Sequence, residues 1–264
     1  MSPSRDEQEH FLHVALAAAE KANGFIKDKT ARGFTTKTKD DGSFVTNVDI
    51  GVERLIRREL ERAFPGHDVT GEELGSSKNN SDYRWFIDPI DGTLSFKLGL
   101  PSYGTILFLC YKEQPIVAVI SHPPLNRLYH AVLGHGAYRN GKRIRIKDVP
   151  FAQVKTEMVA TGDLYAFRLA SSVGKYKQLL KKHPLVRTIP DCLGHTCAAE
   201  GTVGAMVDYY LNYWDFAATE LLVAEAGGKF VITGTKKLTD GNTAYNMICG
   251  KPRVVNWLLN EVFG

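Results

Sequence analysis

Apolar residues in the first quarter of the chain recur at the spacing of amphipathic helices. Between residues 8 and 27 they return close to every third or fourth position, which predicts a helix. A second helix is predicted over residues 47–64, where the apolar side chains share one side and Pro65-Gly66 ends the pattern. The N-terminal part is therefore expected to begin with two helices.

Short apolar runs bounded by turn residues then replace the helical pattern. The block from residue 105 to residue 133 is typical of a strand meander, and Asn140-Gly141 is typical of a tight hairpin turn. A meander implies an antiparallel sheet, which we expect to carry helices on one side. The strands predicted here are residues 68–70, 83–87, 104–111, 115–120 and 127–133.

Strands and helices alternate after residue 150. This alternation predicts a smaller α/β half over residues 146–264, packed against an α+β half over residues 1–145 that holds the antiparallel sheet. No repeat, low-complexity tract or linker separates the two halves. In the C-terminal half, strands are predicted at 157–161, 205–210, 229–232 and 245–249, and helices at 165–182, 193–202, 215–226 and 253–262.

The segment 86–93 combines an apolar strand with chemistry suited to a cation. Asp88 and Asp91 follow the apolar run three residues apart, and Gly92 permits backbone angles that other residues avoid. Carboxylate and carbonyl oxygens are ligands for Mg²⁺, and the N–H groups of Gly92 and Thr93 can receive an anion. Taken alone, such a motif more often belongs to an ordinary turn in which Asp91 caps a helix.

Further motifs extend this pattern along the chain. Gly71-Glu72-Glu73 follows a predicted strand, and Trp214-Asp215 opens a predicted helix. With residues 45–49 and 85–93, these motifs resemble in order and spacing the inositol monophosphatase family of Mg²⁺-dependent, lithium-sensitive phosphatases. The resemblance extends over most of the chain, as far as Gly227-Gly228. It implies the α+β/α/β sugar-phosphatase fold, like inositol monophosphatase and fructose-1,6-bisphosphatase, with alternating helix and sheet layers.

The resemblance also implies a site for two or three Mg²⁺ ions. Glu72, Asp88 and the carbonyl of Ile90 would hold one ion, and Asp88, Asp91 and Asp215 the second. Glu72 would also help to hold the attacking water or a weak third ion. The first ion would make a hydroxide-like nucleophile, and the second would neutralise the leaving alkoxide. Most of these ligands belong to the N-terminal half, whereas Asp215 comes from the C-terminal half.

The same resemblance assigns the groups around the metal ions. The Thr93 hydroxyl, oriented by Asp49, would take part in activating the water, and the Gly92 and Thr93 amides would cradle the phosphate. Two acids also have structural interpretations. Glu73 is expected to be a hydrogen-bonding partner rather than a direct ligand, and Asp215 can act as an N-cap of its helix as well as a ligand.

Acidic residues of the C-terminal half bear on the choice of substrate. Asp191 and Asp208 would make charge-assisted hydrogen bonds to an imidazole and an ammonium group, and Asn212 would add a neutral contact. In these respects the chain looks more like the histidinol-phosphate phosphatase branch of the family than like the inositol branch. The segments that carry this likeness are residues 39–43, 187–192 and 207–215.

Other features leave alternatives open. Pro190 and residues 193–195 depart from the histidinol branch, Leu94-Ser95 departs from the common inositol continuation, and Asp191 can be a helix N-cap. Histidinol phosphate is the predicted substrate, and inositol 1-phosphate is the close alternative, ahead of nucleotide 3′-phosphates and fructose bisphosphate. A non-catalytic role in binding a protein or RNA is the alternative of a different class.

Composition and charge limit the partners. The 264 residues are 44% apolar and 23% charged, as in soluble domains, and no segment is apolar enough to span a membrane. The N-terminus lacks a hydrophobic signal core, so we expect a cytoplasmic protein. The net charge of +4 is modest and spread, which suits a small anionic substrate and speaks against nucleic acid. The family resemblance implies a homodimer.

Cysteine and histidine spacing speaks against zinc. The four cysteines form no C-x-x-C pair, and we expect them to be reduced thiols in the core. The eight histidines follow no metal-ligand spacing. The chemistry of the chain therefore depends on its oxygen-bearing side chains.

Overall fold

Eight helices and fifteen strands form in the computed structural model, which describes residues 3–39, 42–77, 79–238 and 241–264. The helices are α1 (Arg5–Arg32), α2 (Asn47–Ala63), α3 (Thr93–Lys97), α4 (Leu164–Leu169), α5 (Val173–Lys182), α6 (Asp191–Ala199), α7 (Tyr213–Glu225) and α8 (Pro252–Leu258). The strands are β1 (Thr36–Thr38), β2 (Phe44–Thr46), β3 (Asp68–Gly71), β4 (Gly75–Ser76), β5 (Tyr83–Asp91), β6 (Gly104–Tyr111), β7 (Gln114–His122), β8 (Arg127–Val132), β9 (Gly136–Arg139), β10 (Lys142–Ile144), β11 (Val159–Thr161), β12 (Val186–Thr188), β13 (Ala205–Leu211), β14 (Lys229–Lys237) and β15 (Thr243–Gly250). Short 3₁₀-helical segments lie at Pro123–Leu125 and Phe151–Thr156, and a π-helical segment lies at Leu259–Phe263.

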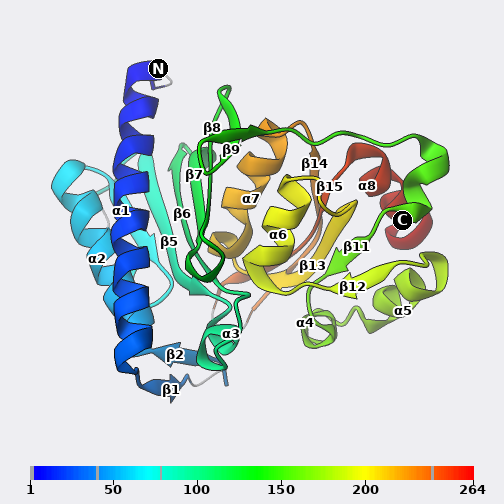
Figure 1. Ribbon diagram of the computed structural model, residues 1–264, viewed down its shortest axis with the longest axis horizontal. Coiled ribbons are helices and arrows are strands. Elements are labelled where there is room, and N and C mark those ends of the chain that lie inside the picture. The colour runs from blue at the N-terminus through cyan, green and yellow to red at the C-terminus, as the bar shows by residue number, and fades with distance from the viewer. Residues whose placement is uncertain (1–2, 40–41, 78, 239–240) are drawn as a thin grey trace.

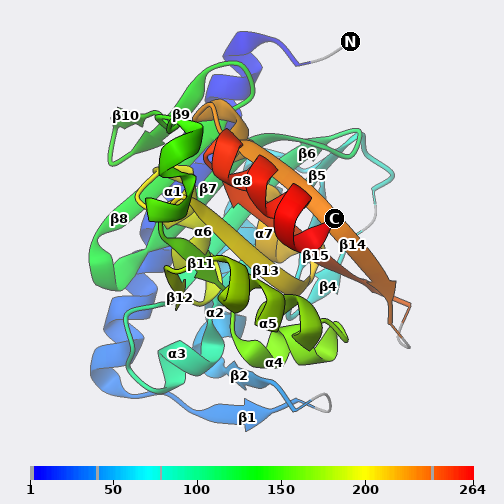
Figure 2. The ribbon, with the colours of Figure 1, turned by 90° about the vertical axis from the view of Figure 1, so that its right-hand side faces the viewer.

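Helix layers and sheet layers alternate through the molecule (Figure 1). Helices α1 and α2 cover one face of an eight-stranded sheet, and α6 and α7 lie between its other face and a five-stranded sheet. Helices α4, α5 and α8 cover the far side of the five-stranded sheet, as Figure 2 shows from that side. The predicted sandwich of alternating layers is confirmed.

Capping boxes begin both N-terminal helices. At α1, the Ser4 side chain accepts a hydrogen bond from the Glu7 backbone while Glu7 bonds back to Ser4, and Thr46 and Asp49 do the same at α2. Both helices form where the apolar spacing predicts them. Helix α2 ends one residue short of the prediction, and α1 is longer than predicted at both ends.

The eight-stranded sheet has the order β10-β9-β8-β7-β6-β5-β3-β4, and only β3 and β5 pair in parallel. Strands β6 and β7 are buried along almost their whole length, because helices cover both faces of the sheet. The expectation of helices on one side is therefore wrong, since α6 and α7 from the C-terminal half cover the second face. The hairpin at Asn140-Gly141 is confirmed between β9 and β10.

The five-stranded sheet is mixed, with the order β12-β11-β13-β15-β14. Strand β11 pairs in parallel with β12 and β13, and β15 is antiparallel to β13 and β14. The sequence does not predict β12, which is only three residues long. The single helix expected over residues 165–182 is divided into α4 and α5, and Ser171 lies between them at φ +56°. Serine competes with helical hydrogen bonds, so this Ser171-Ser172 pair favours a break.

The two halves of the chain share a core. Helices α6 and α7 pack on both sheets, so that Phe108 of the first half and Phe216 of the second belong to one apolar cluster. Cys110, Cys192 and Cys249 are buried free thiols, as expected, whereas the free thiol Cys197 is only partly buried. A division of the chain at residue 145 stays a prediction, because this cluster crosses it.

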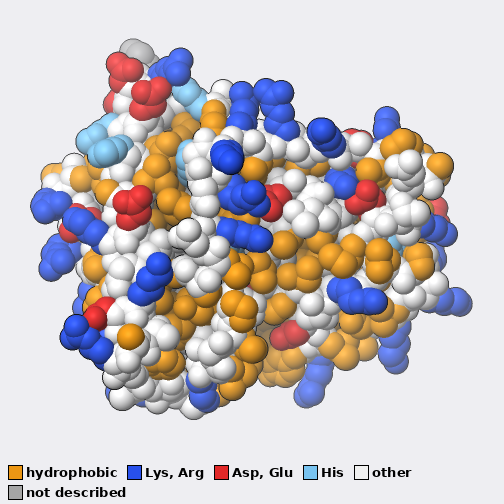
Figure 3. Space-filling view, viewed as in Figure 1, with side chains coloured by type: hydrophobic (Ala, Val, Ile, Leu, Met, Phe, Trp, Pro, Cys, Tyr) orange, Lys and Arg blue, Asp and Glu red, His pale blue; other side chains and the backbone are white. Residues whose placement is uncertain are grey.

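The surface carries mixed charge. On the face shown in Figure 3, lysine and arginine side chains are scattered, with acidic side chains between them. Among the described residues, no helix combines the length and the apolar character needed to cross a membrane.

Candidate active site

Three aspartates from distant parts of the chain meet where β5 ends and α7 begins. Asp88 and Asp91 belong to β5, and Asp215 lies in the first turn of α7. One carboxylate oxygen from each residue lies within 4.8 Å of the other two. The structure thus brings together three side chains that the sequence assigns to a metal site.

An irregularity in β5 places Asp88 and Asp91 on the same side. Side chains three residues apart in a regular strand point to opposite faces of the sheet. Here the pairing with β6 shifts between Asp88, which faces Ile106, and Asp91, which faces Gly104. Such a shift redirects a side chain. Gly92 then takes φ +81° and turns the chain into α3.

Burial makes the cluster unfavourable for uncompensated negative charge. Asp88 is 2% exposed, and its Oδ1 atom has no hydrogen-bond partner among the described residues. Burial raises the pKa of Asp88, and the charges of Glu72, Asp91 and Asp215 raise it further. A divalent cation would restore the charged carboxylates and give Oδ1 a partner. The donor set therefore fits Mg²⁺.

Backbone amides orient the other two carboxylates. Asp91 Oδ2 accepts a hydrogen bond from the Cys192 amide at 2.5 Å, and Asp215 Oδ2 accepts one from the Asn212 amide at 2.7 Å. Burial raises the pKa of both carboxyl groups. The N-cap of α7 is Asn212, so Asp215 supports the helix start from its third position rather than as the N-cap itself.

Glu72 lies in the turn after β3, where a lysine contacts it. The Nζ atom of Lys39 is 2.9 Å from Glu72 Oε1 and 2.6 Å from Glu73 Oε1. Burial raises the pKa of Glu72, and Lys39 opposes that rise. The buried carboxylate of Glu53 accepts hydrogen bonds from the amides of Glu73 and Leu74 at 2.8 and 3.1 Å. Glu53 of α2 therefore fixes the conformation of this turn through hydrogen bonds to its backbone.

Thr93 lies between a carboxylate and a carbonyl. Its Oγ1 is 3.2 Å from Asp49 Oδ1 and 3.0 Å from the carbonyl oxygen of Ile90. Asp49 also accepts hydrogen bonds from the amide and the hydroxyl of Thr46, and burial raises its pKa while these bonds oppose the rise. The Thr93 hydroxyl carries a single proton, so it donates to only one of these two oxygens at a time, and donation to Asp49 leaves the Ile90 carbonyl free to bind a cation.

Asp191 lies beside Gly92, the N-cap residue of α3. A Cβ atom at Gly92 would be 2.7 Å from Asp191 Oδ2 and 2.8 Å from the backbone carbonyl oxygen of Ser102, so only glycine fits there. Asp191 Oδ2 accepts a hydrogen bond from the Ser95 hydroxyl at 3.3 Å. Burial, reinforced by Asp91 and Asp208, raises the pKa of Asp191 to about 8. The N-cap interpretation of Asp191 is wrong, because the residue before it occupies that position of α6.

Asp208 is more deeply buried than Asp191 and has its own partner. Its Oδ2 lies 3.0 Å from Nε2 of His195, whose Nδ1 is 3.2 Å from the Thr219 hydroxyl. Its Oδ1 accepts a hydrogen bond from the amide of Tyr209 at 2.8 Å. Asp208 is 4% exposed, so this network fixes its orientation.

Several contacts of the site could not be found in the sequence. Lys39 lies 33 residues before Glu72, and Ser95 lies 96 residues before Asp191. His195 precedes Asp208 by 13 residues and belongs to a different element. No local pattern links such pairs, because each pair is brought together by the packing of elements that lie apart in the chain.

The sequence profile of the inositol monophosphatase family matches residues 7–262. The chain belongs to this family. Inositol monophosphatase family members are metal-dependent phosphatases that act on small phosphate esters, and the acidic cluster at Asp88, Asp91 and Asp215 agrees with that dependence.

Proteins with different assigned functions are similar to this chain over most of its length. The histidinol-phosphatase of Chlorobaculum parvum is 35% identical over 232 residues, which cover 87% of this chain and 89% of the relative. The Nus factor SuhB of Escherichia coli is 32% identical over 263 residues, 94% of each chain. The solved structure of an IMPase from Thermotoga maritima superposes with a TM-score of 0.79 at 26% identity, covering 96% of this chain and 99% of that one.

Proposed function

We propose that this chain is a Mg²⁺-dependent phosphomonoesterase whose substrate is histidinol phosphate. The observation that carries the proposal is the position of Asp191, a half-buried carboxylate beside the turn at Gly92. A cationic group on the substrate would pair with it through charge-assisted hydrogen bonds, which are roughly twice as strong as neutral ones. The similarity to a histidinol-phosphatase supports the same choice.

The metal would be held by the oxygen atoms of the acidic cluster. Glu72, Asp88, Asp91, Asp215 and the carbonyl of Ile90 are the proposed ligands. When bound, Mg²⁺ supplies a more acidic water and neutralises charge on the leaving oxygen. The amide contacts to Asp91 and Asp215 fix those two carboxylates before the metal arrives, so little reorganisation is needed.

The remaining residues would orient the reactants. The Thr93 hydroxyl donates to Asp49, which leaves its oxygen free to accept a hydrogen bond from the attacking water. The amides of Gly92 and Thr93 open α3 and would donate to the phosphate oxygens. Asp191 would then face the part of the substrate beyond the phosphate, whereas Asp208 is buried and its two oxygens are engaged by His195 and the Tyr209 amide.

The test compares two esters in the wild type and in Asp191→Ala. The hydrogen bonds of a charged group contribute about 1.5–3 kcal/mol, so the variant should raise the KM for histidinol phosphate roughly 10- to 100-fold. The KM for inositol 1-phosphate should change far less. Equal effects on the two esters would remove the argument for histidinol phosphate while leaving the phosphatase assignment in place.

Inositol 1-phosphate is the second candidate. Hydroxyl groups gather at the same position, because Ser102 donates to Ser95, which in turn donates to Asp191. Such a chain offers neutral hydrogen bonds to a polyol. A higher kcat/KM for inositol 1-phosphate than for histidinol phosphate would favour this candidate.

The similarity to a Nus factor makes a non-catalytic role, in binding a protein or RNA, the alternative to catalysis. Release of phosphate from a generic ester in Mg²⁺ distinguishes it from catalysis. If the wild type and Asp91→Asn release equally little, the enzymatic proposal fails.

A further inference from the structure

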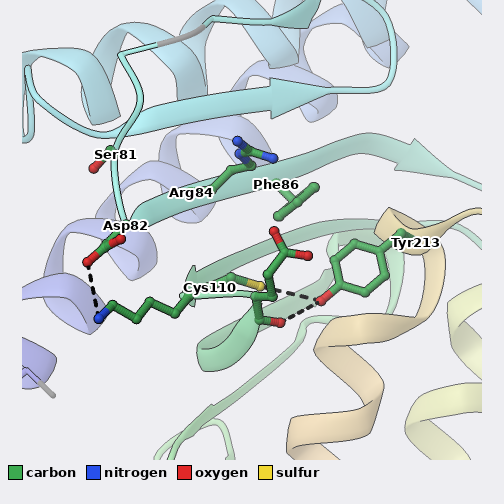
Figure 4. A pocket seen from close by; sticks show the side chains of 8 residues that line it. Ser81, Asp82, Arg84, Phe86, Cys110 and Tyr213 are labelled. Carbon is green, nitrogen blue, oxygen red and sulfur yellow. Dashed lines mark hydrogen bonds and ion pairs between the residues drawn. The ribbon is translucent and has the colours of Figure 1, made fainter.

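A pocket of about 260 Å³ opens at the beginning of β5, away from the strand end that carries the metal cluster. Arg84 and Phe86 line it from β5, on the side of the strand that also carries Asp88. Tyr213, the first residue of α7, and Cys110 of β6 line it as well (Figure 4). None of the three clustered aspartates is among its lining residues.

The turn between β6 and β7 at this pocket has an unfavourable backbone. Lys112 and Glu113 have φ of +48° and +71°, in the left-handed region that residues with a Cβ rarely adopt. The β9–β10 turn has nearly the same angles, but it uses Asn140-Gly141, which suit them. Lys112 and Glu113 both line the pocket. Strain of this kind persists at sites where the side chains are needed.

Two oppositely charged side chains of the pocket, Arg84 and Glu113, remain available to a ligand. Lys112 Nζ lies 3.6 Å from Asp82 Oδ2, and Figure 4 shows Asp82 at one side of the pocket. Arg84 contacts Asp68 with a single nitrogen at 3.2 Å, and its side chain is 43% exposed, so most of its five N–H donors are left over. Glu113 makes no ion pair with any other described residue.

Aromatic rings supply the apolar part of the pocket. Phe86 stacks on Phe108 with ring centres 4.8 Å apart, and it meets the edge of Tyr213 at 5.1 Å. The Tyr213 hydroxyl donates to the carbonyl of Glu113 at 3.3 Å and lies 3.5 Å from the sulfur of Cys110. A ligand that carries both charges and a compact apolar group matches this lining.

We propose that the pocket binds a free α-amino acid, with its carboxylate on Arg84, its ammonium group on Glu113 and its side chain against Phe86 and Tyr213. Binding of the amino acid would affect the metal cluster through Tyr213. The hydroxyl of Tyr213 is hydrogen-bonded to the β6–β7 turn, and Tyr213 precedes Asp215 by two residues on α7. The site is therefore regulatory, and it does not depend on which phosphate ester is hydrolysed.

Thermal denaturation of the Mg²⁺-loaded protein with each standard L-amino acid at millimolar concentration tests the binding. At least one should raise Tm by roughly 3 °C at tenfold excess over its Kd. Its methyl ester, which lacks the carboxylate, and its N-acetyl derivative, which lacks the ammonium group, should each lose the effect. A flat response to every amino acid, or an equal response to the blocked derivatives, would overturn the proposal.

Variants locate the binding site. Glu113→Gln should weaken binding of the amino acid at least tenfold, whereas Asp191→Asn, at the active site, should leave it unchanged. The double variant Lys112→Asn/Glu113→Gly recreates the favourable β9–β10 turn, so it should fold, show a higher Tm and lose the response. Binding that survives in this stable variant, or that disappears in Asp191→Asn, would overturn the proposal.

Kinetics separate regulation from competition at the active site. With a chromogenic phosphate ester in Mg²⁺, the amino acid should change kcat at least twofold and leave KM unchanged. An increase in KM alone would indicate binding at the active site and contradict the proposal. Absence of all turnover, in contrast, would count against the proposed phosphatase activity. The Tm measurements would still show whether the pocket binds an amino acid.

Discussion

The ammonium group of Lys39 lies 2.9 Å from the carboxylate of Glu72, and it also contacts Glu73 at 2.6 Å. The three side chains are partly buried beside the acidic cluster, so Lys39 supplies positive charge where burial alone would favour neutral acids. A metal ion that uses Glu72 has to share this carboxylate with the lysine.

Removal of Lys39 should therefore strengthen metal binding. In Lys39→Gln, the Mg²⁺ concentration for half-maximal activity should fall about twofold to fivefold, since one partly exposed ion pair contributes up to about 1 kcal/mol. Lys37→Gln, an exposed lysine of β1, loses the same charge without touching Glu72 and serves as the control. An unchanged or higher Mg²⁺ requirement in Lys39→Gln would contradict the competition.

Replacement of a clustered aspartate should abolish turnover without unfolding the protein. Asp88→Asn and Asp215→Asn should each lower kcat/KM by more than about 100-fold, because even partners behind a metal ligand cost 10- to 100-fold. In chelator, both variants should be at least as stable as the wild type, because each removes a carboxyl group from a buried set of like charges. Phosphate release and thermal denaturation measure the two effects, and normal activity in either variant would rule out the site.

The Thr93 side chain should contribute to catalysis through its hydroxyl group rather than through its volume. Thr93→Val keeps the volume but removes the contacts to Asp49 and Ile90, and kcat should fall by about 10²–10⁴-fold. Thr93→Ser keeps the hydroxyl and should retain most of the activity. Single-turnover rates of the two variants make the comparison, and similar rates in both would exclude a role for the hydroxyl.

His122 should make the protein sensitive to mild acid. It is fully buried, with its ring nitrogens 3.2 Å from the Tyr103 carbonyl and 3.0 Å from the Thr196 hydroxyl, and burial lowers its pKa to about 4. In the unfolded chain its pKa is about 6.5, so the unfolded state binds the proton first as the pH falls. Stability from the neutral imidazole is complete above that value and declines below it. Between about pH 7.5 and about pH 5, we expect a loss of about 2 kcal/mol.

A variant without the imidazole isolates this effect. The unfolding free energy of His122→Gln should be lower than that of the wild type at neutral pH, and the difference should shrink by about 2 kcal/mol at about pH 5. The charges of Arg127 and His195 also lower the pKa of His122. Other groups that titrate between these pH values contribute equally to the unfolding free energy of both proteins, so their contributions cancel in the difference. Urea unfolding at both pH values gives the difference, and a constant gap would show that His122 does not titrate on unfolding.

Local patterns predicted most of the elements. The apolar spacing and Pro65 located α2, and the apolar runs located β5 to β8, because strands buried in a meander need such residues at nearly every position. The patterns did not predict β1, whose polar residues are partly exposed, or the break at Ser171. They also could not indicate that α7 covers the second face of the eight-stranded sheet.

The sequence by itself determined the family and the identity of the acids, because each motif is a short run in which strand, turn and carboxylate follow one another. Asp88 and Asp91 are three residues apart, and their turn is specified by their immediate neighbours. Only the tertiary structure decided how Asp215 approaches them, how Lys39 neutralises Glu72, and how His195 restrains Asp208. Such pairings depend on the packing of elements far apart in the chain, and no local periodicity records that packing.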